Sequence, residues 1–155
     1  KGLQYLLNVW WDFPKGPYIE LDIVGCQVHL GHLSHVGGWG MFAHQAMPEI
    51  YRRFHVLVLP TLEDGIALCV QEAMASGVVP IATADPAEVF KDGVSGITIP
   101  HRDPQAIKDA LTMLRDNPER RREMARAARG LAEQQTWEKM KEDVKEIIRR
   151  ECGQT

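Results

Sequence analysis

Residues 56–77 have the sequence VLVLPTLEDGIALCVQEAMASG, which combines a strand, a loop and a helix. The four apolar residues at 56–59 form an unbroken run, as expected for a strand that is covered on both faces of a parallel sheet. The run ends at Pro60, and a helix is predicted from about Leu68 to Ser76, with Gly77 as its C-terminal stop signal. A strand followed by a loop and a helix is the repeating unit of α/β folds.

The sequence on both sides of this stretch continues the alternation. Further strands are predicted where short apolar runs occur, at 21–25, 28–30, 78–82 and 96–99. Further helices are predicted by helical spacing or by Asn/Asp-Pro start signals, at 3–11, 47–54, 105–115, 119–133 and 137–150. The glycine-rich residues 36–40 are expected to form a loop. We therefore predict an α/β protein with a doubly wound, Rossmann-like parallel sheet and helices on both faces.

Composition excludes several classes of protein. The chain has 155 residues, 45% of them hydrophobic and 25% charged, which suits one ordinary folded domain. The formal charge of −3 argues against a nucleic-acid partner, which needs a strongly basic face. The sequence contains no run of 18 apolar residues, so no membrane-spanning helix is predicted. The arginines of 119–133 could face anionic lipid, but neighbouring acidic residues favour a solvated face, so peripheral membrane contact stays open. Three widely spaced cysteines, an odd number, favour a cytoplasmic location.

The loop after residues 56–59 carries the candidate chemistry. Ligands of open parallel sheets lie at the carboxyl ends of the strands. The amides of Gly65 to Leu68 would be donors at a helix N-terminus, which suits a pyrophosphate. Glu72 lies one helical turn beyond Leu68, where its carboxylate could accept hydrogen bonds from ribose hydroxyls. Helix capping alone would produce the same arrangement, so the pattern by itself leaves both explanations open.

The exact residues resemble a known signature. Asp64 and Glu72 are acidic residues separated by seven others, and Ala73-Met74-Ala75-Ser76-Gly77 follows. This stretch resembles the signature of the large retaining glycosyltransferase family of the GT-B fold, the glycosyl transferases group 1, which includes sucrose synthases. Further similarities extend the resemblance over nearly the whole chain, at Lys1-Gly2, 92–96, 101–104 and Thr136-Trp137.

The resemblance implies a role for each matching residue. Glu72 would bind the donor ribose, and Asp64 would lie beside the transferred sugar as a catalytic residue. Lys1 would be the second catalytic residue, because a cation stabilises the charge that develops on the departing diphosphate. The backbone of Gly65, Ile66, Ala67 and Leu68 would line the sugar and diphosphate. The donor would be a nucleoside-diphosphate sugar, with no metal or other cofactor.

The resemblance also implies a domain organisation. Residues 1–155 would be the C-terminal donor-binding domain of a two-domain enzyme, whose N-terminal domain binds the acceptor and is absent. The chain alone would then bind the donor weakly and transfer nothing. The first, central strand of the sheet would also be missing, so the strands at 21–24 and 56–59 should not pair directly.

Three departures keep a second hypothesis open, a non-catalytic relative that only binds the nucleotide sugar. Asp64 replaces the usual Glu, and Ala67 replaces a Gly that permits close backbone approach. The Gly-Gly expected near 84–87 is absent. The motif at 63–77 argues against a third reading, a sugar-nucleotide epimerase.

Other features receive simpler interpretations. The spacing of His29, His32 and His35 suggests a zinc site. The three residues are predicted in a strand that runs into a loop, an arrangement that does not bring all three side chains to the same face, so a structural role is favoured. Trp137 and Met140 are expected in the core. Cys69 is expected to pack against the sheet and to be unreactive.

Overall fold

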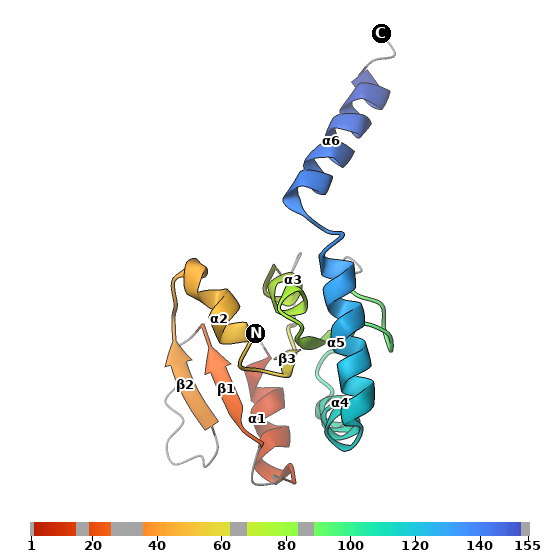
Figure 1. The fold of residues 1–155 in the computed structure, drawn as a ribbon. Helices are drawn as coiled ribbons and strands as arrows, with labels where there is room; N and C mark the ends of the chain where they lie inside the picture. The colour runs from red at the N-terminus through yellow and green to blue at the C-terminus, as the bar shows by residue number, and fades with distance from the viewer. Residues whose placement is uncertain (1, 15–18, 26–35, 63–67, 84–88, 153–155) are drawn as a thin grey trace.

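The computed structural model describes residues 2–14, 19–25, 36–62, 68–83 and 89–152 (Figure 1). The strands are β1 (Leu21–Val24), β2 (Val36–Gly40), β3 (Val56–Leu59), β4 (Val79–Thr83) and β5 (Ile97–Ile99). The helices are α1 (Leu3–Asp12), α2 (Met47–Tyr51), α3 (Leu68–Ala75), α4 (Pro104–Asp116), α5 (Pro118–Ala132) and α6 (Trp137–Cys152). A short 3₁₀ helix, η1, spans His44–Ala46 and leads into α2.

The strands form two parallel sheets. β1 pairs with β2, and β4 lies between β3 and β5 in the second sheet. β1 and β2 thus form one sheet, and β3, β4 and β5 form another, with parallel pairing throughout as in a doubly wound fold. Within the described residues β1 and β3 belong to different sheets, so the predicted lack of direct pairing between them is confirmed. The predicted fold class, a parallel α/β fold of Rossmann-like type, is also confirmed.

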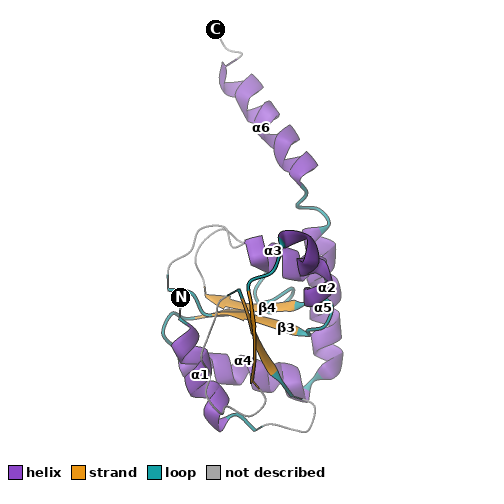
Figure 2. Cartoon of the chain, turned by 90° about the vertical axis from the view of Figure 1, so that its left-hand side faces the viewer, coloured by secondary structure: helices purple, strands orange, loops and turns teal. Residues whose placement is uncertain are grey.

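Helices cover both faces of the β3-β4-β5 sheet, as Figure 2 shows for α1 and α4 on one side and α3 on the other. Val79 and Ile81 of β4 pack on the α1 and α4 side, in a cluster that includes Leu6, Val9, Trp10, Ile107 and Leu114. Ala82 packs on the opposite side with Met74 of α3 and Ala128 of α5. Because both faces are covered, every residue of β4 is buried.

Residues 36–40 form strand β2, so the prediction of a loop there is wrong. Glycine has a low strand propensity, but Gly37 lies opposite Asp22, and a Cβ at Gly37 would stand 2.0 Å from Asp22 Oδ1. That oxygen accepts a hydrogen bond of 2.7 Å from Trp39 Nε1. The glycine therefore permits a close approach inside the sheet. The strand predicted at 28–30 lies outside the described residues.

Helix α4 begins as the Asp103-Pro104 pair predicts. The Asp103 Oδ1 atom accepts a hydrogen bond of 3.0 Å from the Ala106 amide, and Pro104 occupies the first helical position. Asn117 precedes Pro118 in the same way, but its side chain makes no cap to α5. Its Nδ2 instead donates to the Met113 carbonyl at the end of α4.

We predict that Asp103→Ala lowers the free energy of unfolding by about 1 kcal/mol, because an amide at the start of α4 loses its acceptor. Urea denaturation of the purified protein measures this change. Asp103→Asn keeps a side-chain oxygen at the cap and should retain most of the stability. An alanine variant as stable as the wild type would show that the cap contributes nothing.

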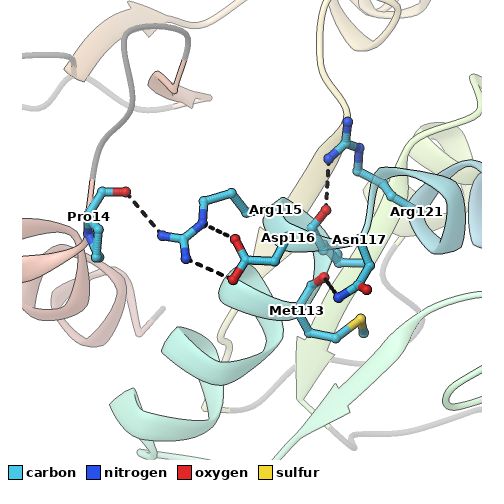
Figure 3. A network of polar contacts seen from close by, with 7 residues as sticks. Pro14, Met113, Arg115, Asp116, Asn117 and Arg121 are labelled. Carbon is cyan, nitrogen blue, oxygen red and sulfur yellow. Dashed lines mark hydrogen bonds and ion pairs between the residues drawn. The ribbon is translucent and has the colours of Figure 1, made fainter.

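A polar network fixes the end of α1 against the end of α4 (Figure 3). The Arg115 guanidinium donates to the Pro14 carbonyl at 3.2 Å and lies 5.2 Å from the ring centroid of Phe13. The same guanidinium binds both carboxylate oxygens of Asp116. The Leu114 carbonyl accepts a hydrogen bond of 2.8 Å from Arg121 of α5. These contacts join the end of α1 to α4 and α5.

Helix α6 extends away from the rest of the described chain (Figures 1 and 2). None of its residues is buried, and the side chains of Trp137 and Met140 are 64% and 51% exposed. The expectation that these two residues lie in the core is therefore wrong, because no other described element covers the apolar stripe of this helix. None of the helices in the described ranges has the length and apolar character needed to cross a bilayer.

Candidate functional site

The carboxyl end of β3 and the start of α3 frame the candidate site. Pro60 and Thr61, which follow β3 directly, are buried. Helix α3 begins at Leu68, whose side chain is 49% exposed. The predicted site residues Asp64, Gly65, Ile66 and Ala67 lie outside the described residues. Their shared pocket with Leu68 and Glu72 therefore stays a prediction.

Glu72 lies one turn into α3, and its carboxylate has two side-chain partners. The Tyr51 hydroxyl donates to Glu72 Oε2 at 3.2 Å. His44 Nδ1 lies 3.5 Å from Glu72 Oε1, which makes an ion pair when the imidazole is protonated. Both partners come from the segment that joins β2 to β3, so this segment holds the carboxylate of a helix that follows it in the chain. About a third of the Glu72 side chain, 31%, remains accessible.

Tyr51 is anchored in the protein interior. Its side chain is 7% exposed and packs with Ala73 of α3 and with Val78, which precedes β4. Burial raises the pKa of the Tyr51 phenol well above its usual value, and the negative charge of Glu72 raises it further. Tyr51 therefore keeps its proton and acts as a hydrogen-bond donor throughout the working pH range.

The start of α1 meets the end of β3. Gly2 is the N-cap of α1 and has a φ of 65°, in the left-handed region. A Cβ on Gly2 would stand 1.6 Å from the Pro60 carbonyl oxygen, so the two backbone segments are in direct contact. Lys1 itself lies outside the described residues. Its neighbour Gly2 nevertheless brings the start of the chain to the strand end that precedes the candidate loop.

The ends of β3, β4 and β5 converge on one carbonyl oxygen. The Thr83 hydroxyl at the end of β4 donates to the Thr61 carbonyl at 3.0 Å. His101, which follows β5, places Nδ1 at 3.0 Å from the same oxygen. Thr61 and Thr83 are both buried. These bonds fix the position from which the chain leaves β3 toward the candidate loop.

The sequence predicts Glu72 as a site residue but does not indicate the residues that contact its carboxylate. Tyr51 and His44 are separated from Glu72 by 21 and 28 positions, so no local spacing connects them to it. The histidines at 29, 32 and 35 lie outside the described residues. Within the described parts of the chain, no group of three or more His, Cys, Asp or Glu side chains is arranged to hold a metal ion.

Known proteins resemble this chain in sequence or in fold. A sucrose synthase from Acidithiobacillus caldus is 38% identical over 101 residues, which cover 61% of this chain and 13% of that protein. The structure of a sucrose-phosphate synthase from Thermosynechococcus elongatus superposes with a TM-score of 0.85 at 20% identity, over all of this chain and 43% of that one. The structure of HepE from Anabaena in complex with UDP gives a TM-score of 0.77 at 18% identity, over 86% of this chain and 41% of that one.

The chain thus spans less than half the length of each of these three proteins. The family model described as "Glycosyl transferases group 1" matches residues 1–117, which is most of the chain. This match includes α1, all five strands and the whole of the candidate site. The chain belongs to the glycosyl transferases group 1 family, whose structures have the GT-B fold.

Proposed function

We propose that this chain binds a nucleoside-diphosphate sugar at the carboxyl ends of β3 and β4. In the whole protein it would serve retaining transfer of the sugar to an acceptor bound by a separate N-terminal domain. The observation that carries the proposal is the Glu72 carboxylate, held by Tyr51 and His44 one turn inside α3 and still partly accessible. A fixed carboxylate beside a helix N-terminus suits a ribose next to a diphosphate.

Each proposed role follows from the chemistry of the bond that breaks. When the bond between the sugar carbon and the diphosphate oxygen breaks, negative charge develops on the diphosphate. The amides of Gly65 to Leu68 and the Lys1 ammonium would stabilise this charge. Asp64 would lie beside the reacting sugar carbon. The contact between Gly2 and Pro60 supports the role of Lys1, because Gly2, which follows Lys1 in the chain, lies at the end of β3. The reaction needs no resident cofactor, because the nucleoside diphosphate of the donor is itself the leaving group.

A uridine nucleotide is the first donor to test. HepE, which shares the fold, has been solved with UDP and also with UDP-glucose, the latter superposing with a TM-score of 0.74. GDP and ADP serve as alternative probes, because the sequence contains no identified nucleobase contact. Isothermal titration of the protein with the three diphosphates would identify the base.

We predict that Glu72→Ala weakens binding of the preferred nucleoside diphosphate by about 1–3 kcal/mol, because the ribose hydroxyls lose a charged acceptor. Titration calorimetry on the whole protein, with the acceptor-binding domain present, measures the loss. Glu146→Ala on the exposed helix α6 removes the same charge far from the site and should bind like the wild type. An unchanged affinity in Glu72→Ala would remove the ribose role.

Enzyme assays separate the proposal from its alternative. Ala67 and the altered residues at 84–87 favour a second candidate, a module that binds the donor without transferring the sugar. Donor binding together with acceptor-dependent release of the diphosphate supports the transferase. Donor binding without any release, when the acceptor-binding domain is present, supports the non-catalytic module.

A further inference from the structure

The two oxygens of the Glu72 carboxylate are held by different side chains of one segment. Tyr51 donates to Oε2 at 3.2 Å, and His44 Nδ1 lies 3.5 Å from Oε1. We propose that Tyr51, assisted by His44, is a positioning residue that sets the Glu72 carboxylate in its donor-binding orientation before the donor arrives. This inference rests on the proposed function, in which Glu72 binds the ribose.

Tyr51 has the rigidity that this role requires. Its ring is held in a cluster with Ala73 and Val78, which are 0% and 1% exposed. Ala73 is the residue next to Glu72, so the Tyr51 ring and the Glu72 backbone share one packed surface. The hydroxyl therefore has a fixed direction with respect to α3. Because Tyr51 stays protonated, it donates to Oε2 at every working pH.

The arrangement leaves the carboxylate with capacity for a ligand. A carboxylate offers about four lone-pair positions, and Tyr51 and His44 address one on each oxygen. The positions that remain can accept the two ribose hydroxyls. Side-chain atoms of Glu72 are 31% exposed, so a ligand can reach them.

Positioning has an energetic consequence. A glutamate on an open helix surface samples several rotamers, and ordering such a side chain opposes binding. At Glu72 this ordering takes place during folding, through the bond with Tyr51, so the donor meets a side chain that is already oriented. His44 contributes less, because its side chain is 81% exposed and exposed ion pairs are weak.

The decisive test compares nucleotides with and without ribose hydroxyls. UDP, GDP and ADP and their 2′,3′-dideoxy forms are titrated into the wild type, Tyr51→Phe, His44→Ala and Glu72→Ala. Tyr51→Phe removes one oxygen and keeps the buried ring. We expect it to weaken the preferred diphosphate about 3- to 10-fold, as expected for loss of a hydrogen bond to a charged group and of side-chain order. It should leave the affinity of the dideoxy form unchanged.

Tyr5→Phe is the matched control. Tyr5 lies on α1, on the side of the sheet opposite α3 and Glu72, and Tyr5→Phe removes the same phenolic oxygen there, so its affinities for both forms should equal those of the wild type. His44→Ala changes an exposed residue and should fold normally. It is expected to weaken the preferred diphosphate about two- to threefold, the range of an exposed pair, and to leave the dideoxy form unaffected.

The outcomes separate the two proposals. If Glu72→Ala weakens the diphosphate while Tyr51→Phe binds both forms like the wild type, the positioning role is overturned and the ribose role stands. Equal weakening of both forms in Tyr51→Phe indicates a structural role only and also overturns it. If Tyr51→Phe does not fold, an unchanged affinity in His44→Ala overturns it. If the whole protein, with its acceptor-binding domain, binds no diphosphate, or if Glu72→Ala binds normally, the proposed function and this inference fail together.

Discussion

Gly2→Ala is expected to lower the free energy of unfolding by about 2–5 kcal/mol. Two costs add: about 1–2 kcal/mol for an L-residue in the left-handed region, and about 1–3 kcal/mol for displaced backbone. The first arises because Gly2 has a φ of 65°. The second arises because the new Cβ would stand 1.6 Å from the Pro60 carbonyl oxygen, and neither atom belongs to a flexible side chain.

Urea denaturation of the two proteins measures this loss, and Gly130→Ala provides the matched control. Gly130 lies in α5, and a Cβ there meets nothing within 4 Å. Alanine at this position should be neutral or stabilise the protein by up to about 1 kcal/mol, because alanine favours helix. A Gly2→Ala variant within about 0.5 kcal/mol of the wild type, the usual spread of surface substitutions, would show that the contact with Pro60 yields easily.

Trp10→Ala is expected to lower the free energy of unfolding by about 3–5 kcal/mol, the usual cost of removing a buried large aromatic side chain. Trp10 is 4% exposed and stacks on Phe13, with ring centroids 5.9 Å apart. It belongs to the cluster that joins α1 to α4 and β4, so its removal leaves a cavity between layers.

The neighbouring tryptophan supplies the control for this experiment. Trp11 is 69% exposed, and Trp11→Ala should change the stability by less than about 1 kcal/mol. Guanidinium denaturation followed by circular dichroism reports both variants independently of the lost tryptophan fluorescence. Equal effects of the two substitutions would contradict the assignment of Trp10 to the core.

The sequence predicts most elements of the fold because local signals determine them. The apolar run gives β3 its observed bounds, Val56–Leu59, and Asp103-Pro104 marks the start of α4. Strand β2 is not predicted in this way, because the fit of Gly37 depends on the Asp22 side chain of the neighbouring strand. The sequence correctly predicts that helix α6 begins at Trp137, but periodicity shows only that a stripe is apolar and not whether another element covers it.

In the candidate site, too, some residues can be predicted from the sequence and others cannot. Glu72 could be chosen from the sequence, because a fixed spacing on one helix relates it to Leu68. Tyr51 and His44 could not, because they reach Glu72 only after β3 and α3 bring the two segments together. The contact of Gly2 with Pro60 joins residues 58 positions apart and likewise depends on the tertiary fold. The predicted site residue Glu72 is thus more visible in the sequence than the residues that contact its carboxylate.

The contact of His101 with the Thr61 carbonyl determines where the imidazole carries its proton. A carbonyl oxygen can only accept, so Nδ1, which lies 3.0 Å from it, must be the donor. The neutral ring is therefore the Nδ1–H tautomer, with its lone pair on Nε2, and the imidazolium form carries protons on both nitrogens. While this bond persists, Nδ1 cannot serve as a base or bind a metal ion. Any acid–base or ligand chemistry of His101 must take place at Nε2.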